Sequence, residues 1–168
     1  AEALWILAFN GGANHEAFAA HGAALALAQL AMHSPSAKGK MWAGAAMGNL
    51  AAAYGNVPGE VSESVRIMLA EWPGLVEALV GMVARGPVQL GEEWPSQAHK
   101  ETRFAESVVA WGAGQALKNL AMSRVAQGRI REAKGVRALC HLKASPDWLE
   151  KMKAELTLNI LGEGCSEL

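Results

Sequence analysis

A short run of small and apolar residues occurs three times in the chain, and this recurrence restricts the fold more than any other feature. The copies are residues 3–8 (ALWILA), 46–51 (AMGNLA) and 116–121 (ALKNLA). The first two copies begin 43 residues apart and the last two begin 70 apart. Self-similarity at such a period is typical of stacked helical repeats, which bury their apolar faces against their neighbours.

Three glycines, Gly22, Gly74 and Gly135, give a second landmark, because each precedes an apolar helical stretch. Their distances from the motif copies place about nine extra residues in segment 54–60 and about 18 between residues 84 and 103. Insertions in stacked repeats go to loops, where they leave the stack intact. We therefore expect one repeat array over residues 1–168, with an inserted loop around residues 85–102.

Glycine, proline, asparagine and serine residues, which start or end helices, separate the apolar stretches. No segment has the alternating pattern of a strand. The helical patterns run over residues 38–54, 62–69, 75–84, 103–125, 128–143 and 146–161. In the first of these, apolar or small residues occupy every face, as in a helix at the centre of a stack. The predicted class is all-α.

The three motif copies resemble the third helix of the armadillo family, which carries an Ala-Leu-Trp-Asn-Leu-Ala-like run. The resemblance covers nearly the whole chain and implies a right-handed α-solenoid of about three to four armadillo-like repeats. The last unit departs from the pattern, since Gly162 stands where the asparagine is expected. This departure suggests a terminal or shortened repeat.

Armadillo arrays bind partner proteins or extended peptides on a concave face built from third helices, where asparagine side chains bond the partner's backbone. Asn49 and Asn119 match that position. An amide side chain has both a donor and acceptors, so it can pair with any extended chain. The alternative is that each asparagine satisfies a nearby helix end or loop.

Tryptophans and a glutamine accompany these asparagines. In importin-type members a tryptophan lies one turn before the asparagine, but Ala45 and Gln115 stand there in this chain, which weakens a nuclear-signal function. Trp42 and Trp111 lie about two turns before the asparagines, where they either edge the same face or pack between repeats. Trp94, in the inserted loop, is expected to be exposed for a partner.

The formal net charge is only −1, so the chain as a whole has no field that would attract nucleic acid or an anionic membrane. Five basic residues still cluster late in the chain and form a candidate docking patch, with a solvated helix face as the plainer interpretation. They are Arg124, Arg129, Arg131, Lys134 and Arg137. Nucleic-acid binding through the basic stretch from Arg124 to Lys143 is only the third hypothesis, behind a protein-binding scaffold and a structural subunit.

The sequence gives no support to an enzyme. The five histidines show no i, i+4 pair that could hold a metal, and adjacent Cys140 and His141 would point about 100° apart on a helix. No glycine-rich segment has the strand–turn–helix context of a phosphate-binding loop. We expect no catalytic residues, no metal and no cofactor.

Two further features concern the environment of the chain. Gly44 and Gly48 form the GxxxG spacing of packed transmembrane helices, but polar residues interrupt each apolar run, so no membrane span is expected. Cys140 and Cys165 are too few and too distant for a disulfide framework, and Cys140 is expected to be a small buried hydrophobe. An intracellular location, in cytoplasm or nucleus, is favoured.

The sequence thus predicts a protein–protein interaction scaffold, an adaptor that holds a partner on its concave face. The alternative is a structural accessory subunit built permanently into a large multiprotein complex. The chain begins within a helical pattern at Ala1, so we expect it to be part of a longer protein.

Overall fold

In the computed structural model, every regular element of the described residues is a helix, which confirms the all-α class. The described residues are Glu2, Ala3, Ile6 and residues 13–50, 59–84, 97–145 and 147–165. The helices are α2 (Ala13–Ala20), α3 (Ala23–His33), α4 (Ala37–Leu50), α5 (Gly59–Glu71), α6 (Leu75–Ala84), α7 (Gln97–Leu120), α8 (Arg124–Glu132), α9 (Gly135–Lys143) and α10 (Trp148–Leu161).

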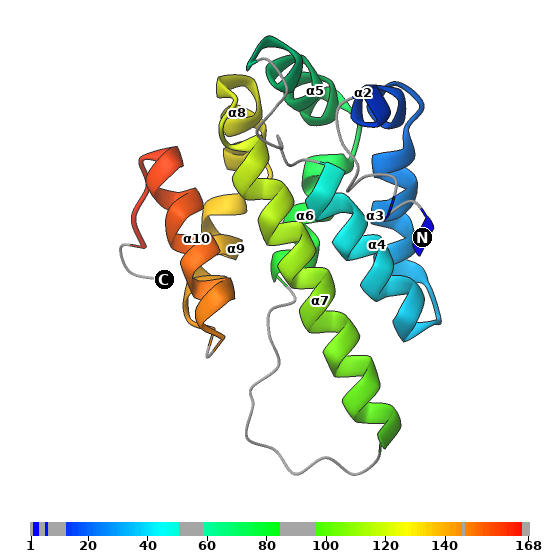
Figure 1. The fold of residues 1–168 in the computed structure, drawn as a ribbon. Coiled ribbons are helices and arrows are strands. Elements are labelled where there is room, and N and C mark those ends of the chain that lie inside the picture. The colour runs from blue at the N-terminus through cyan, green and yellow to red at the C-terminus, as the bar shows by residue number, and fades with distance from the viewer. Residues whose placement is uncertain are drawn as a thin grey trace.

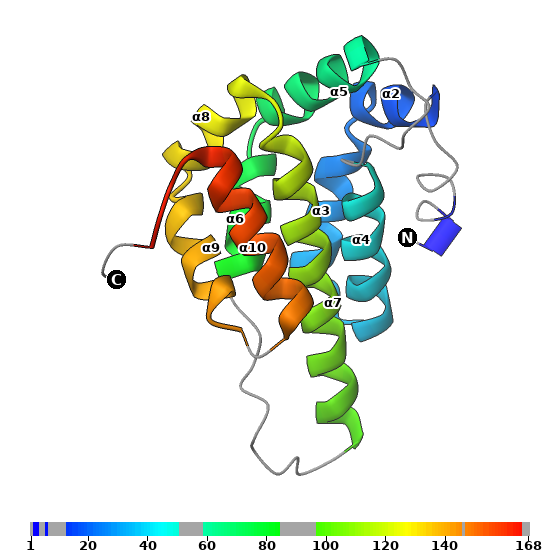
Figure 2. The ribbon, with the colours of Figure 1, turned by 60° about the vertical axis from the view of Figure 1, so that its left-hand side comes forward.

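Each helix packs on the helix three places further along the chain. The contacts join α2 to α5 and α5 to α8, α3 to α6 and α6 to α9, and α4 to α7 and α7 to α10. Figures 1 and 2 show the same three rows, with the short helices α2, α5 and α8 along one end. Within each triplet the second helix also packs on the third, so α3 contacts α4, α6 contacts α7 and α9 contacts α10.

A residue with left-handed backbone precedes each helix of the middle row. Gly22 (φ 70°) precedes α3, Gly74 (φ 80°) precedes α6 and Lys134 (φ 62°) precedes α9. The landmark expected at Gly135 is therefore wrong by one residue. Gly135 is instead the first residue of α9, where a Cβ atom would lie 2.5 Å from Cγ2 of Ile130.

Three glycines bring α4 and α7 into close contact. A Cβ atom on Gly44 would lie 2.7 Å from the Cα atom of Val109, and one on Gly112 would run into the carbonyl oxygen of Gly44. Gly48 also faces Gly112. Small residues allow two helix backbones to approach in this way. The GxxxG spacing therefore serves a helix crossing inside the fold, and no described helix is by itself long and apolar enough to span a bilayer.

Two of the three motif copies thus lie side by side, since they end α4 and α7. Of the first copy only Ala3 and Ile6 are described, so its place in the row stays a prediction. The inserted loop was predicted to extend to residue 102, but α7 begins at Gln97, so residues 97–102 are helical. Residues 85–96, which include Trp94, lie outside the described residues.

A disulfide joins the segment after α10 to α9, so Cys140 is more than the small buried hydrophobe that was expected. Cys140 is buried, as expected, but it is bonded to Cys165, 25 residues later, with Cα atoms 5.6 Å apart. Arg131 of α8 holds the same terminal segment through an ion pair with Glu163 at 2.9 Å. The segment after α10 is therefore fixed against the α8–α9 side.

Replacing Gly112 by alanine should lower the free energy of unfolding by about 2–3 kcal/mol, because the new methyl group forces α4 and α7 apart. Gly81→Ala is the matched control. Its Cβ atom would meet nothing within 4 Å, so alanine should stabilise α6 by about 0.5–1 kcal/mol. Urea unfolding measures both variants, and equal effects of the two substitutions would contradict the glycine-mediated crossing.

Replacing Cys165 by serine should lower the free energy of unfolding by about 3 kcal/mol under oxidising conditions, because the unfolded chain loses a cross-link over 25 residues. The wild-type protein in a thiol reductant is the control and should match the variant. A urea midpoint that does not change in either case would show that the bond does not form.

Candidate binding face on the α4–α7–α10 row

Partly or fully exposed side chains recur along α7 every three or four residues. They are Phe104, Val108, Trp111, Gln115, Lys118 and Met122, the last in the turn after the helix. Residues at this spacing lie on one face of a helix. Val109, Ala113 and Leu117, which lie between members of this set, are buried. We call this exposed stripe, together with its neighbours on α4 and α10, the row face.

Asn119 lies beside this stripe with an incomplete set of hydrogen bonds. Its side chain is 8% exposed, and its Oδ1 atom accepts a hydrogen bond from Nε2 of Gln115 at 3.3 Å. Within the described residues, its Nδ2 donor has no acceptor. Buried donors are nearly always paired, and an unpaired one costs about 1–3 kcal/mol. Because this donor is itself almost fully covered, the side chain has to turn toward the exposed stripe before an acceptor from outside the chain can bond it.

On α4, Asn49 is buried and Trp42 is half-buried. Seven residues separate them, which is about two helical turns, so they share one face of α4. Because α4 packs on α7, these two residues lie on the helix next to α7 in the row. The predicted residues Asn49, Asn119 and Gln115 thus lie on neighbouring helices of one row, and their binding role stays a prediction.

Trp111 is half-buried and links α7 to α10. The Nζ atom of Lys153, on α10, lies 3.7 Å from the centroid of its ring. A cation held over a tryptophan face is attracted by the ring's quadrupole. The ring therefore packs between α7 and α10, and its role at the edge of a binding face stays a prediction.

Glu150, also on α10, is a buried carboxylate that the sequence did not lead us to expect. It is 1% exposed and accepts hydrogen bonds from Oγ of Ser145 at 2.7 Å and Oγ of Ser107 at 3.3 Å. Burial, which outweighs these two hydrogen bonds, raises the pKa of Glu150. The carboxylate therefore joins α10 to α7 at a cost in desolvation.

The start of α10 explains how Glu150 reaches this place. Asp147 caps the helix by accepting hydrogen bonds from the backbone N–H groups of Leu149 (2.8 Å) and Glu150 (3.2 Å). The backbone N–H of Asp147 donates in turn to Oγ of Ser145 at 3.0 Å. This local cap sets the Ser145 hydroxyl where it can donate to the carboxylate one turn later.

Lys153 is the second missed residue. It is 4% exposed, and within the described residues its Nζ atom has no hydrogen-bond acceptor. Burial, and then the nearby Lys118, lower the pKa of Lys153 from 10.5 to about 7. A sequence signal for Lys153 and Glu150 existed: they fall on the same helical face as the buried residues Ala154 and Thr157.

The predicted basic patch is partly neutralised. Arg129 pairs with Glu77 at 3.6 Å and with Glu132 at 3.3 Å, and Arg131 pairs with Glu163. Lys134 occupies the left-handed turn before α9. Arg124 and Arg137 are exposed on α8 and α9, away from the α4–α7–α10 row. These residues do not form a uniform cationic surface.

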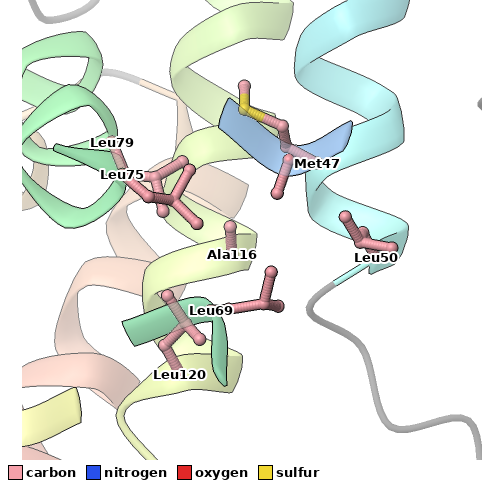
Figure 3. A pocket seen from close by; sticks show the side chains of 8 residues that line it. Met47, Leu50, Leu69, Leu75, Leu79, Ala116 and Leu120 are labelled. Atoms are coloured by element: carbon pink, nitrogen blue, oxygen red, sulfur yellow. The ribbon is translucent and has the colours of Figure 1, made fainter. Parts of the chain in front are cut away.

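Among the described residues, no group of three His, Cys, Asp or Glu side chains could hold a metal. Leu50, Leu69, Leu75 and Leu120 point into one interior gap of about 10 Å³, which Figure 3 shows from close by. That volume fits about one water, and the lining is apolar. The gap is a packing defect of the core.

No family model, curated protein or solved structure matches the chain. The row face therefore has to be judged from its own residues.

Replacing Lys153 by methionine should raise the free energy of unfolding at pH 7 by about 1–4 kcal/mol, because a buried and incompletely paired ammonium group is removed. The pKa of Lys153 is about 7 in the folded protein and 10.5 in the unfolded chain. The cost of the lysine is therefore complete below pH 7 and disappears as the pH approaches 10.5.

The difference in free energy of unfolding between the methionine variant and the wild type should therefore decrease from pH 7 to pH 10.5. Urea unfolding at several pH values measures this difference. Lys151→Met, on the exposed side of the same helix, is the control and should change stability by less than about 0.5 kcal/mol. A destabilised Lys153→Met variant at pH 7 would show that the contact with Trp111 outweighs desolvation.

Proposed function

We propose that the protein is a protein–protein interaction scaffold of the armadillo type, which holds an extended segment of a partner along the row face. The arrangement of like helices in three rows supports this proposal, because stacked helical triplets expose one helix of each triplet as a continuous surface. In this scheme α4, α7 and α10 are the third helices of successive units.

The observation that carries the proposal is the side chain of Asn119. Its buried Nδ2 donor lacks an acceptor within the described residues, and the amide of Gln115 lies next to it. An extended peptide offers backbone carbonyl and N–H groups at regular intervals, which amide side chains can bond whatever the sequence. The ring of Trp111, one turn before Gln115, offers an apolar contact for the peptide's side chains.

One observation favours the alternative of a structural subunit fixed in a larger assembly. Trp148, Met152 and Leu156 of α10 are exposed by 72%, 38% and 44% and recur every four residues. They form an apolar stripe away from Glu150 and Lys153, which face α7. An exposed stripe of this kind fits a lasting helix–helix contact with another subunit.

A display library of random 12-residue peptides, selected on the immobilised protein, tests the scaffold proposal. Selected peptides should bind Asn119→Ala about tenfold more weakly than the wild type, since one buried hydrogen bond is lost. Asn159→Ala is the control and should bind as the wild type does, because Asn159 is exposed on α10. Circular dichroism checks that each variant is folded.

Two results would count against the proposal. Selection of no peptide would refute an extended ligand. Peptides that lose affinity with Leu156→Ser and keep it with Asn119→Ala would favour the structural-subunit alternative.

A further inference from the structure

The side of α10 that faces away from α7 carries an apolar stripe made of Trp148, Met152 and Leu156, which we call the outer stripe. All three side chains are exposed, and they recur every four residues along one side of the helix. The helix that carries them is the outermost of α4, α7 and α10 (Figure 1). The disulfide of Cys165 with Cys140 holds the segment after α10 against α9, and the outer stripe stays exposed.

The preceding helix of the row, α7, contacts its neighbours on two sides. Val109 and Gly112 lie against the backbone of α4. Ser107 and Trp111 lie against side chains of α10. A helix inside the row is therefore covered both by the helix before it and by the helix after it.

The side of α10 that faces the preceding helix corresponds to that of α7 by a constant shift along the sequence. Glu150 contacts α7 and lies 41 residues after Val109. Lys153 also contacts α7 and lies 41 residues after Gly112. Successive helices of the row thus present equivalent positions to the helix before them.

The same shift identifies the outer stripe as the side of α10 that a following helix would cover. A shift of 41 residues takes Ser107 to Trp148 and Trp111 to Met152. Because α10 packs on Ser107 and Trp111, the equivalent residues on α10 lie where one more helix would pack. In stacked helices such an apolar side is buried against its neighbour. The outer stripe is therefore suited to bind a helix.

Charges beside the outer stripe favour a second copy of α10 as that helix. Lys151 and Glu155 each precede a residue of the stripe and are four residues apart, so they lie along one flank of it. When two α10 helices pack antiparallel around Met152, Lys151 of each copy approaches Glu155 of the other. A parallel pair would bring like charges together. Glu155 also pairs with Lys143 of α9 at 3.5 Å, and both side chains stay partly exposed.

We propose that the outer stripe binds the outer stripe of a second copy of this protein, so that the two α10 helices form an antiparallel pair. A two-fold axis near Met152 places Trp148 of one copy against Leu156 of the other. This inference goes beyond the proposed function, which uses amide side chains of α7, and it assigns a partner to a different surface.

A contact through one helix of each copy is small. With 14 residues, α10 is about 21 Å long. Small interfaces are typical of weak or transient complexes, so we expect a dissociation constant on the order of 10 µM.

Sedimentation velocity at about 1 to 300 µM protein tests the inference. The wild type should pass from monomer to dimer over this range, and Leu156→Ser should weaken the association at least about tenfold. Val125→Ser, on α8, is the matched control and should dimerise as the wild type does. The two replaced side chains are similarly exposed, by 44% for Leu156 and 42% for Val125, so neither substitution puts folding at risk.

Charge variants and cysteine variants test the antiparallel arrangement. Lys151→Glu and Glu155→Lys should each dimerise more weakly alone, and an equimolar mixture of the two should recover the wild-type affinity, because opposite charges meet again. Met152→Cys should give a cross-linked dimer on mild oxidation, since the two copies of this position lie near the axis. Asn159→Cys should not, because antiparallel packing separates its two copies.

The outcomes decide the inference separately from the proposed function. A wild-type protein that stays monomeric over the whole range would overturn it. A dimer that Leu156→Ser leaves intact, or a mixture of charge variants that associates no better than each variant alone, would also overturn it. Peptide binding that depends on Asn119 is measured on another helix, so its result stands whether or not the dimer forms.

Discussion

The close crossing of α4 and α7 is the constraint on which the remaining structure depends. Gly44 and Gly112 allow the two backbones to touch, and side chains at these positions would separate them. This crossing aligns the row of α4, α7 and α10, because α10 then packs on the other side of α7. The middle row and the row of short helices follow the same order, so each triplet covers the apolar faces of the next.

Two buried polar groups along this row are difficult to explain by stability alone. Asn119 keeps a buried donor without an acceptor within the described residues, and Lys153 keeps a buried ammonium group over Trp111. Apolar residues of similar size would avoid both desolvation costs. Proteins commonly retain such costs where a ligand relieves them, and both residues lie at the edge of one exposed helical face.

A disulfide is typical of oxidising compartments, so the bond to Cys165 weighs against the expected cytoplasmic or nuclear location, which stays a prediction.

The sequence predicted the parts of the fold that depend on periodicity. The small-residue runs that end α4 and α7 identified two neighbouring helices, since small residues mark close contacts wherever they recur. The landmark before α9 was placed one residue too late, at Gly135, because Lys134 adopts a conformation that is usual for glycine. The pairing of Cys140 depends on where the chain returns after α10, and sequence spacing does not contain that information. Glu150 and Lys153 were missed because charged residues are rarely buried.

The side-chain amide spectrum of the protein offers the most direct test of the row face as a binding surface. In a ¹H–¹⁵N experiment, the Nδ2 resonances of Asn119 and the Nε2 resonances of Gln115 should shift when a selected peptide is added, because a new acceptor meets these donors. The resonances of Asn159, on the exposed side of α10, should stay in place and serve as the internal reference. Shifts at Asn159 with none at Asn119 and Gln115 would contradict the proposed face.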